Sequence, residues 1–160
     1  MKLQLTTTAF AAGQPIPSRH AFDQEDISPA LQWSGVPPTA RSLVLICDDP
    51  DAAGGTWVHW VVYNIPITTA GLAEDVPKSP LLVSGVMQGM NDYQRIGYGG
   101  PCPPPGKAHR YFFKLYALNY QPHLKPGLKK QDLLSVMEGH IIAEGELMGT
   151  YRREGRHGVD

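Results

Sequence analysis

The stretch Trp57-Val58-His59-Trp60-Val61-Val62-Tyr63-Asn64-Ile65 decides the class of fold. It consists almost entirely of β-branched and aromatic residues, which pack well on a pleated sheet, and Pro66 ends it. Residues 41–47 and 109–118 read as further strands on either side, because apolar and aromatic residues dominate both. No helix signal separates these strands, which excludes a parallel βαβ arrangement and predicts an all-β or α+β fold.

Outside these three strands the chain is rich in turns. Its 17 glycines and 15 prolines favour many short connections over long helices. Residues 3–10 alternate weakly and residues 81–86 are apolar, so each segment is expected to add a short strand. Apolar residues at helical spacing predict one helix over residues 129–151. A break between Gly139 and Glu146 is the alternative, because glycine disfavours helix interiors.

The composition limits the classes of function. The chain has 160 residues, of which 42% are hydrophobic and 18% charged, values that suit a globular protein. Its net charge is -1 and its basic residues are scattered, so no nucleic-acid partner is expected. Two cysteines, Cys47 and Cys102, make no disulfide framework, and no stretch resembles a signal peptide or a transmembrane helix. We therefore expect a cytoplasmic protein with reduced thiols and no integral membrane segment.

Four polar residues stand at or near the ends of the predicted strands. His109 and Tyr111 share one face of their strand, Asp49 closely follows residues 41–47, and His59 lies near the start of the strand predicted over residues 57–65. Each residue alone has an ordinary structural explanation, as a turn residue or a partly buried ring. Together they adjoin glycine- and proline-rich loops, and this set predicts a pocket for an anionic group.

The expected roles of these residues differ. A histidine pair that is cationic or donates hydrogen bonds suits a phosphate or carboxylate, and Tyr111 can donate one more hydrogen bond. The backbone N–H groups of residues 97–100 can approach an anion closely, because three of these residues are glycines. Asp49 is expected to hold a histidine in one tautomer rather than to touch the ligand. Alternation also predicts that Trp57, His59, Val61 and Tyr63 share a face.

Enzymatic alternatives stay open at this point. Asp49, His59 and His109 include the ligand types that zinc or iron takes, although their spacing matches no compact metal motif. Cys102 with His109 could form a thiol hydrolase, but no helix N-terminus adjoins Cys102 in the sequence to activate it. Neither a Gly-x-Ser-x-Gly elbow nor a nucleotide-binding glycine motif is present. No cofactor is expected.

Several separate motifs in order resemble the phosphatidylethanolamine-binding protein family, also called Raf kinase inhibitor-like proteins. They are Asp49-Pro50-Asp51-Ala52, Trp57-Val58-His59, Gly100-Pro101 and His109-Arg110-Tyr111, with Ser28-Pro29-Ala30-Leu31-Gln32-Trp33 before them. Residues 137–143 are similar to the bacterial and archaeal branch. The resemblance runs from residue 6 to residue 153.

The resemblance implies a mainly β, sandwich-like fold with a large central antiparallel sheet, Greek-key connections and a C-terminal helix. It implies one domain over residues 1–160, with its core at 6–153 and a basic polar tail at 154–160. It also implies a small ligand pocket. The residues expected there are Asp49, His59, His109 and Tyr111, with Gly100 and Pro101 in the wall and Trp57 nearby.

The function expected from these observations is binding without catalysis. The ligand would be a small anion such as phosphate, a phosphoethanolamine-like molecule or a carboxylate, and binding would regulate or inhibit a protein partner. A hydrolase acting on a phosphoester or ester, with or without a metal, is the alternative. The oligomeric state is open, with a homodimer as one option.

Overall fold

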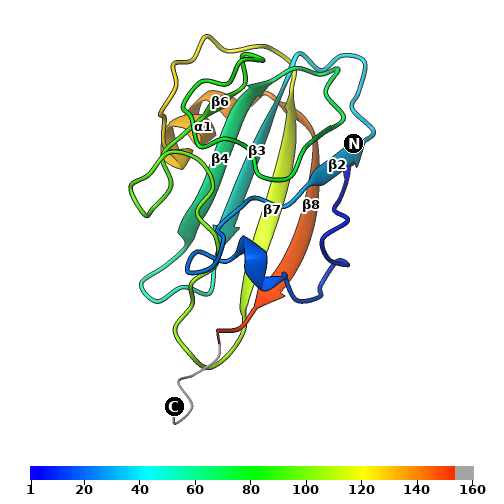
Figure 1. Ribbon diagram of the computed structural model, residues 1–160. Helices are drawn as coiled ribbons and strands as arrows, with labels where there is room; N and C mark the ends of the chain where they lie inside the picture. Colours follow the sequence, from blue (N-terminus) through cyan, green and yellow to red (C-terminus); the bar gives the residue numbers. More distant parts are fainter. Residues whose placement is uncertain (154–160) are drawn as a thin grey trace.

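The strands form two antiparallel sheets in the computed structural model, which describes residues 1–153 (Figure 1). The five-stranded sheet has the order β6-β4-β3-β7-β8, and the three-stranded sheet has the order β1-β2-β5. The large sheet contains β3 (Ser42–Asp49), β4 (Trp57–Ile65), β6 (Met87–Gln88), β7 (His109–Leu118) and β8 (Ile141–Tyr151). The small sheet contains β1 (Gln4–Thr6), β2 (Leu31–Ser34) and β5 (Gly71–Leu72), and the helices are η1 (Ser18–His20) and α1 (Lys130–Met137).

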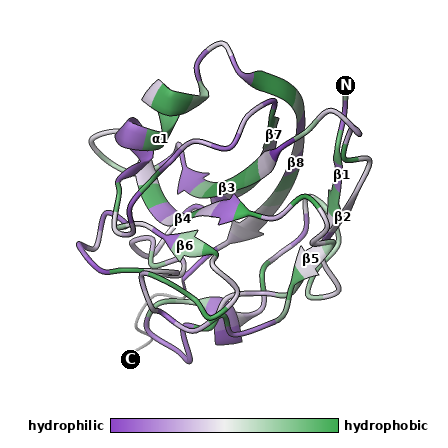
Figure 2. Cartoon of the chain, turned by 90° about the horizontal axis from the view of Figure 1, so that it is seen from above, coloured by the Kyte–Doolittle hydropathy of each residue, from purple (hydrophilic) through white to green (hydrophobic). Residues whose placement is uncertain are grey.

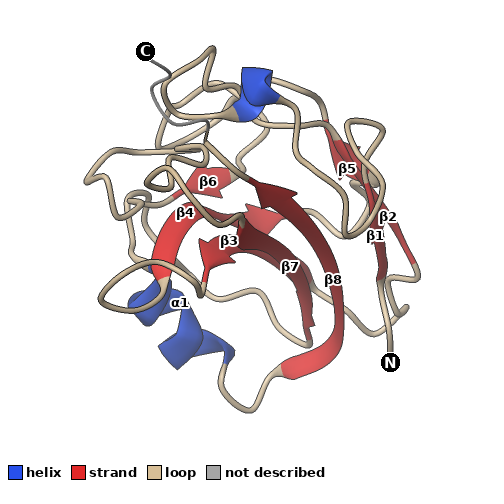
Figure 3. Ribbon diagram, turned by 90° about the horizontal axis from the view of Figure 1, so that it is seen from below, coloured by secondary structure: helices blue, strands red, loops and turns tan. Residues whose placement is uncertain are grey.

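The large sheet is covered on both faces, which makes the arrangement sandwich-like. Leu5 of β1 and Trp33 of β2 pack against the face that carries Leu45 and Phe113. Leu133 and Met137 of α1 pack against the opposite face, in a second apolar cluster. Figure 3 shows α1 and the small sheet on opposite sides of the large sheet, and in Figure 2 the hydrophobic colouring runs along β7 and β8. The expected mainly β, antiparallel fold is confirmed.

The long connection from β4 to β7 returns the chain to the other side of β3, as long return connections do in Greek-key arrangements. It spans residues 66–108 and contains the glycine- and proline-rich loop. It also contains β5 and β6, whereas residues 81–86, expected to form a strand, form an isolated bridge from Leu81 to Met87 and a turn. The pairing of β6 with β4 therefore begins just after the apolar segment that suggested a strand.

The predicted helix over residues 129–151 is wrong beyond Met137. The helix ends there, Gly139 takes a positive φ of 79°, and β8 then pairs with β7 from Ile141 to Tyr151. Burial in β8 alternates along the strand, with the small Gly145 facing inward where the N-terminal segment crosses. A Cβ at Gly145 would meet the carbonyl oxygen of Leu3, so glycine serves close packing here. Pairing of residues 141–151 with β7 therefore decides the structure of this segment, although its apolar residues also fit helical spacing.

A β-bulge interrupts the pairing of β3 with β4. Cys47 faces Trp60 and Asp48 faces Val58, so His59 is the additional residue on β4. The bulge reverses the alternation, so Trp60 joins the apolar cluster under the small sheet, while Val61 joins the cluster under α1. The expectation that Val61 and Tyr63 share a face with His59 is therefore wrong.

Within residues 1–153, no helix has both the length and the hydropathy that crossing a membrane requires. The expected basic tail over residues 154–160 lies outside the described residues.

Candidate functional site

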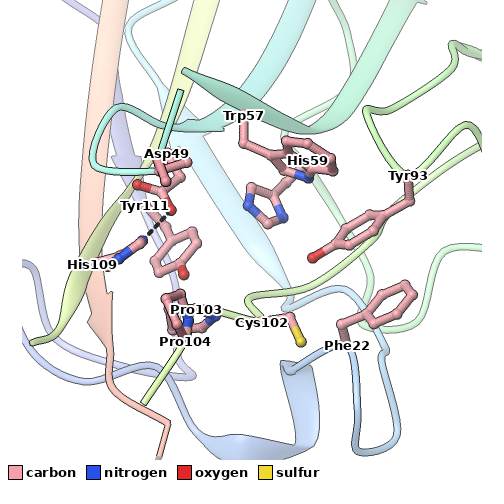
Figure 4. Close-up of a pocket in the computed structure, with 12 residues that line it drawn as sticks. Phe22, Asp49, Trp57, His59, Tyr93, Cys102, Pro103, Pro104, His109 and Tyr111 are labelled. Atoms are coloured by element: carbon pink, nitrogen blue, oxygen red, sulfur yellow. Dashed lines mark hydrogen bonds and ion pairs between the residues drawn. The ribbon is translucent and has the colours of Figure 1, made fainter. Parts of the chain in front are cut away.

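A pocket of about 240 Å³ opens at the end of the large sheet where β3 ends and where β4 and β7 begin. Asp49 closes β3, Trp57 and His59 open β4, and His109 and Tyr111 open β7, so these five side chains meet there (Figure 4). The remaining lining residues come from loops; they are Phe22, Ala52, Ala53, Tyr93, Cys102, Pro103 and Pro104. The structure therefore brings five of the seven predicted site residues together.

Asp49 holds His109 in one orientation. The imidazole Nδ1–H of His109 donates to Asp49 Oδ2 over 2.7 Å, and the other carboxylate oxygen accepts the backbone N–H of Asp51 over 2.7 Å. Both oxygens of the buried carboxylate are thus used inside the protein. This bond puts the Nδ1 proton on His109 and leaves its Nε2 available to a ligand.

His59 enters the pocket as a neutral ring. Its Nδ1 lies 2.6 Å from the carbonyl oxygen of Gly99. A carbonyl can only accept, so Nδ1 carries the proton. Burial lowers the pKa of His59 below its usual value of 6.5, and the ring is therefore uncharged at pH 7. In this tautomer the free Nε2 has a lone pair and accepts hydrogen bonds, so the expected cationic pair of histidines is wrong for His59.

Tyr111 supplies a hydroxyl group that binds no protein group within residues 1–153. Its side chain is 1% exposed, and among the described residues its hydroxyl makes no hydrogen bond. Burial raises the pKa of this phenol well above its usual value, which keeps the hydroxyl protonated as a donor. The ring packs edge-on against His59, with ring centroids 5.1 Å apart. A buried polar group without a protein partner is unusual and suggests a ligand or water.

Three aromatic rings build the opposite wall. Phe22 stacks on Tyr93 with centroids 4.0 Å apart, and Trp57 meets the edge of Tyr93 at 5.5 Å. The Tyr93 hydroxyl donates to the carbonyl oxygen of Gly100 over 2.6 Å, which ties this wall to the glycine-rich loop. Among the described residues, no lysine or arginine lines the pocket. The site is therefore apolar on one side and offers polar groups, including the Asp49 carboxylate, on the other.

Gly100 and Pro101 support the pocket from behind rather than line it. The N–H of Gly100 donates to Asp26 Oδ1, and the carbonyl of Pro101 accepts the N–H of Phe22. The N–H groups of Gly97 and Gly99 also donate within the protein, to the carbonyls of residues 89 and 59. The expectation that N–H groups of residues 97–100 face an anion is thus wrong for these three glycines, because they hold the loop to its neighbours.

The sequence of this chain matches the family model described as phosphatidylethanolamine-binding protein over residues 6–152. The chain belongs to the phosphatidylethanolamine-binding protein family. A UPF0098 protein of Methanothermobacter thermautotrophicus is 53% identical over 94% of this chain and 99% of its own length. A UPF0098 protein of Aquifex aeolicus is 47% identical over 95% of this chain and 90% of its own length.

Two solved structures of this family have folds similar to that of this chain. A phosphatidylethanolamine-binding protein homologue from Chlamydia trachomatis superimposes with a TM-score of 0.86 at 43% identity, covering 96% of this chain and 99% of that one. E. coli YbcL, described as a member of the mammalian family, gives a TM-score of 0.89 at 32% identity over 96% of this chain and 100% of its own. The bacterial and archaeal branch expected from residues 137–143 is thus confirmed.

Sequence reasoning about this family member missed Phe22 and Tyr93. Phe22 lies in a turn-rich segment and Tyr93 in the long irregular connection, and neither carries an alternation signal. Their stacking depends on contacts between segments far apart in the sequence. Within the described residues, no group of three or more histidine, cysteine or acidic side chains could hold a metal ion. The metal-assisted alternative receives no support from this part of the chain.

Replacing Gly100 by alanine is expected to destabilise the protein by about 1–3 kcal/mol. A Cβ there would overlap the backbone carbonyl oxygen of His20, and a backbone atom cannot rotate away as a side chain can. Thermal unfolding of the two proteins measures the change. Gly106→Ala in the same loop isolates a different cost, because a Cβ there meets nothing within 4 Å and only the positive φ of 136° opposes it. Equal stability of Gly100→Ala and the wild type would contradict this packing.

Proposed function

We propose that this protein binds a small ligand through a phosphate-like group in the pocket between β3, β4 and β7, and that it acts by binding rather than by catalysis. One observation carries the proposal. The hydroxyl of Tyr111 and Nε2 of His59 are both buried, have no protein partner among the described residues, and belong to the same pocket wall. Burying such groups costs free energy unless something pairs with them, so their persistence points to a ligand.

The two groups require different hydrogen-bonding partners on the ligand. Tyr111 donates a hydrogen bond to an oxygen, whereas neutral His59 accepts one from an O–H or N–H group. A protonated phosphate supplies both an acceptor and a donor on one phosphorus. His109, whose Nδ1–H is held by Asp49, lines the same pocket. We therefore infer that the favoured anion carries a proton.

The size and walls of the pocket favour a headgroup over an acyl chain. A volume of about 240 Å³ is below the range of about 300–1,000 Å³ that is usual for drug-sized ligands. The aromatic wall of Phe22, Trp57 and Tyr93 could also face an ammonium group through cation–π contacts. Phosphoethanolamine combines these features, and the family name supports it as a probe.

Free thiols at both cysteines fit a reducing cytoplasm, where we place the protein.

Inorganic phosphate is expected to bind more tightly than sulfate by about tenfold or more at pH 7.5. The hydrogen phosphate dianion has the same charge as sulfate but retains an O–H that His59 Nε2 can accept. A sulfate oxygen would instead face the lone pair of that nitrogen, which costs binding energy. Isothermal titration calorimetry with both salts at one ionic strength measures the ratio of dissociation constants.

His59→Gln is the matched variant for this experiment. A glutamine amide can donate as well as accept, so the preference for phosphate over sulfate should shrink towards one. Equal affinities for the two anions in the wild type would refute the role given to His59. If neither phosphate nor phosphoethanolamine bound at millimolar concentration, the proposed function itself would fall.

A further inference from the structure

We propose that Cys102 is a modification site, which forms a mixed disulfide with a small thiol that carries carboxylate groups, and that this adduct closes the pocket. The modification is independent of the ligand, but the closure rests on the proposed function, because it concerns the same pocket. The modifying reagent is a low-molecular-weight disulfide of the glutathione disulfide type. Cys102 is one of two cysteines in the chain and the only one of the two that lines the pocket.

The environments of the two thiols differ sharply. Cys47 lies in the middle of the large sheet, is 2% exposed, and has a pKa raised by burial well above its usual value. Cys102 is partly exposed in the wall of the pocket. It stands in the sequence Pro101-Cys102-Pro103-Pro104-Pro105, where four prolines restrict the backbone around the sulfur. A disulfide reagent can therefore reach Cys102 but not Cys47.

Arg153 places a positive charge beside the sulfur. Its Nη1 lies 3.3 Å from Cys102 Sγ. Within residues 1–153 no carboxylate makes an ion pair with Arg153, so an incoming anion meets no competing carboxylate in this part of the chain. A guanidinium pairs well with a carboxylate through parallel hydrogen bonds. This contact favours disulfides that carry carboxylates over neutral ones.

The buried groups of the pocket give a second, independent reason to expect a ligand beside Cys102. Tyr111 and His59 are more than nine-tenths buried, and Figure 4 shows both pointing into the pocket that Cys102 lines. Their hydroxyl and Nε2 have no protein partner among the described residues. An adduct on Cys102 that carries carboxylate and amide groups can bond to both of them.

The reaction is thiol–disulfide exchange, which needs no other reactant. The thiolate of Cys102 attacks one sulfur of the small disulfide, a new S–S bond forms, and the old S–S bond breaks. Cys102 releases one proton when it ionises, and the leaving thiolate takes up one proton. Electrons and protons therefore balance. A reducing thiol reverses the exchange. An adduct the size of a short peptide fills a pocket of about 240 Å³ and displaces phosphate.

The experiment follows adduct formation by intact-protein mass spectrometry on the full chain. Glutathione disulfide is the anionic reagent, and bis(2-hydroxyethyl) disulfide is the neutral one. We expect one adduct on the wild type and none on Cys102→Ser. Arg153→Met should lower the ratio of the anionic to the neutral rate constant roughly two- to fivefold, as expected for one partly exposed ion pair. Arg152→Met is the matched control, because Arg152 is exposed and makes no contact with the sulfur in the described structure.

Titration of phosphate into the modified and unmodified wild type then separates the two proposals. Loss of phosphate binding on modification, with recovery after reduction, supports closure of the pocket. An adduct that leaves the affinity for phosphate unchanged overturns closure. Adduct formation on Cys102→Ser, or equal ratios for Arg153→Met and the wild type, overturns the assignment of Cys102 and Arg153. If the unmodified wild type binds neither phosphate nor phosphoethanolamine, the proposed function fails and closure with it, while the mass measurements still decide the modification site.

Discussion

Tyr111→Phe is expected to bind phosphate about tenfold to a hundredfold more weakly than the wild type while unfolding at an equal or higher temperature. The loss of affinity follows because a hydrogen bond to a charged acceptor contributes about 1.5–3 kcal/mol. The stability should not fall, because the hydroxyl makes no protein hydrogen bond among the described residues and is buried. Its removal could stabilise the protein by up to about 1 kcal/mol.

Tyr98→Phe is the matched control for this prediction. Tyr98 is as buried as Tyr111, but its hydroxyl donates to the carbonyl oxygen of His20 over 2.8 Å and does not line the pocket. Removal of the Tyr98 hydroxyl should lower the free energy of unfolding by about 1–2 kcal/mol and leave phosphate affinity unchanged. Differential scanning calorimetry and isothermal titration calorimetry measure the two quantities. If Tyr111→Phe lost stability as Tyr98→Phe does, its hydroxyl would have a structural partner and the argument for a binding site would fail.

Trp60→Ala is expected to destabilise the fold by about 3–5 kcal/mol. The indole of Trp60 is completely buried next to the bulge at His59, packs edge-on against Tyr98, and donates to Gln88 Oε1 over 2.8 Å. Alanine would leave a large cavity and an unpaired amide oxygen. A loss of this size lowers the melting temperature by about 10 °C in a domain of this length.

The control for Trp60→Ala is Val83→Ala, because Val83 is fully exposed and its truncation should change the stability by less than about 0.5 kcal/mol. Urea titration gives the free energy of unfolding of each variant from the shift of the midpoint. A change below about 1 kcal/mol for Trp60→Ala would mean that Trp60 does not anchor the two sheets. The bulge beside it would then need another explanation.

The sequence predicted the strands that carry the site better than the elements around them. The sequence predicts β4 and β7 at their observed bounds, because β-branched and aromatic residues are frequent in both. Alternation correctly put His109 and Tyr111 on one face of β7. The predicted end of β3 at Cys47 was too early, because two aspartates and a proline resemble a turn. The strand in fact continues to Asp49, which places the carboxylate beside Trp57.

What could not be predicted depends on contacts between distant segments. The bulge at His59 arises from pairing with β3 and has no local signature in the sequence. The apolar residues of β8 fit helical spacing, so the sequence predicts a helix there, and only the pairing with β7 shows that the segment is a strand. The neutral state of His59 follows from its burial, and its tautomer follows from the bond to the Gly99 carbonyl. A sequence pattern contains neither.

A crystal structure with phosphate soaked into the pocket shows whether Tyr111 and His59 bind an anion. We expect one phosphate with its oxygens within about 3 Å of the Tyr111 hydroxyl and of His59 Nε2, and with the Asp49–His109 bond intact. A pocket that stays free of phosphate at saturating concentration, or a phosphate bound elsewhere while Tyr111 remains unpaired, would contradict it.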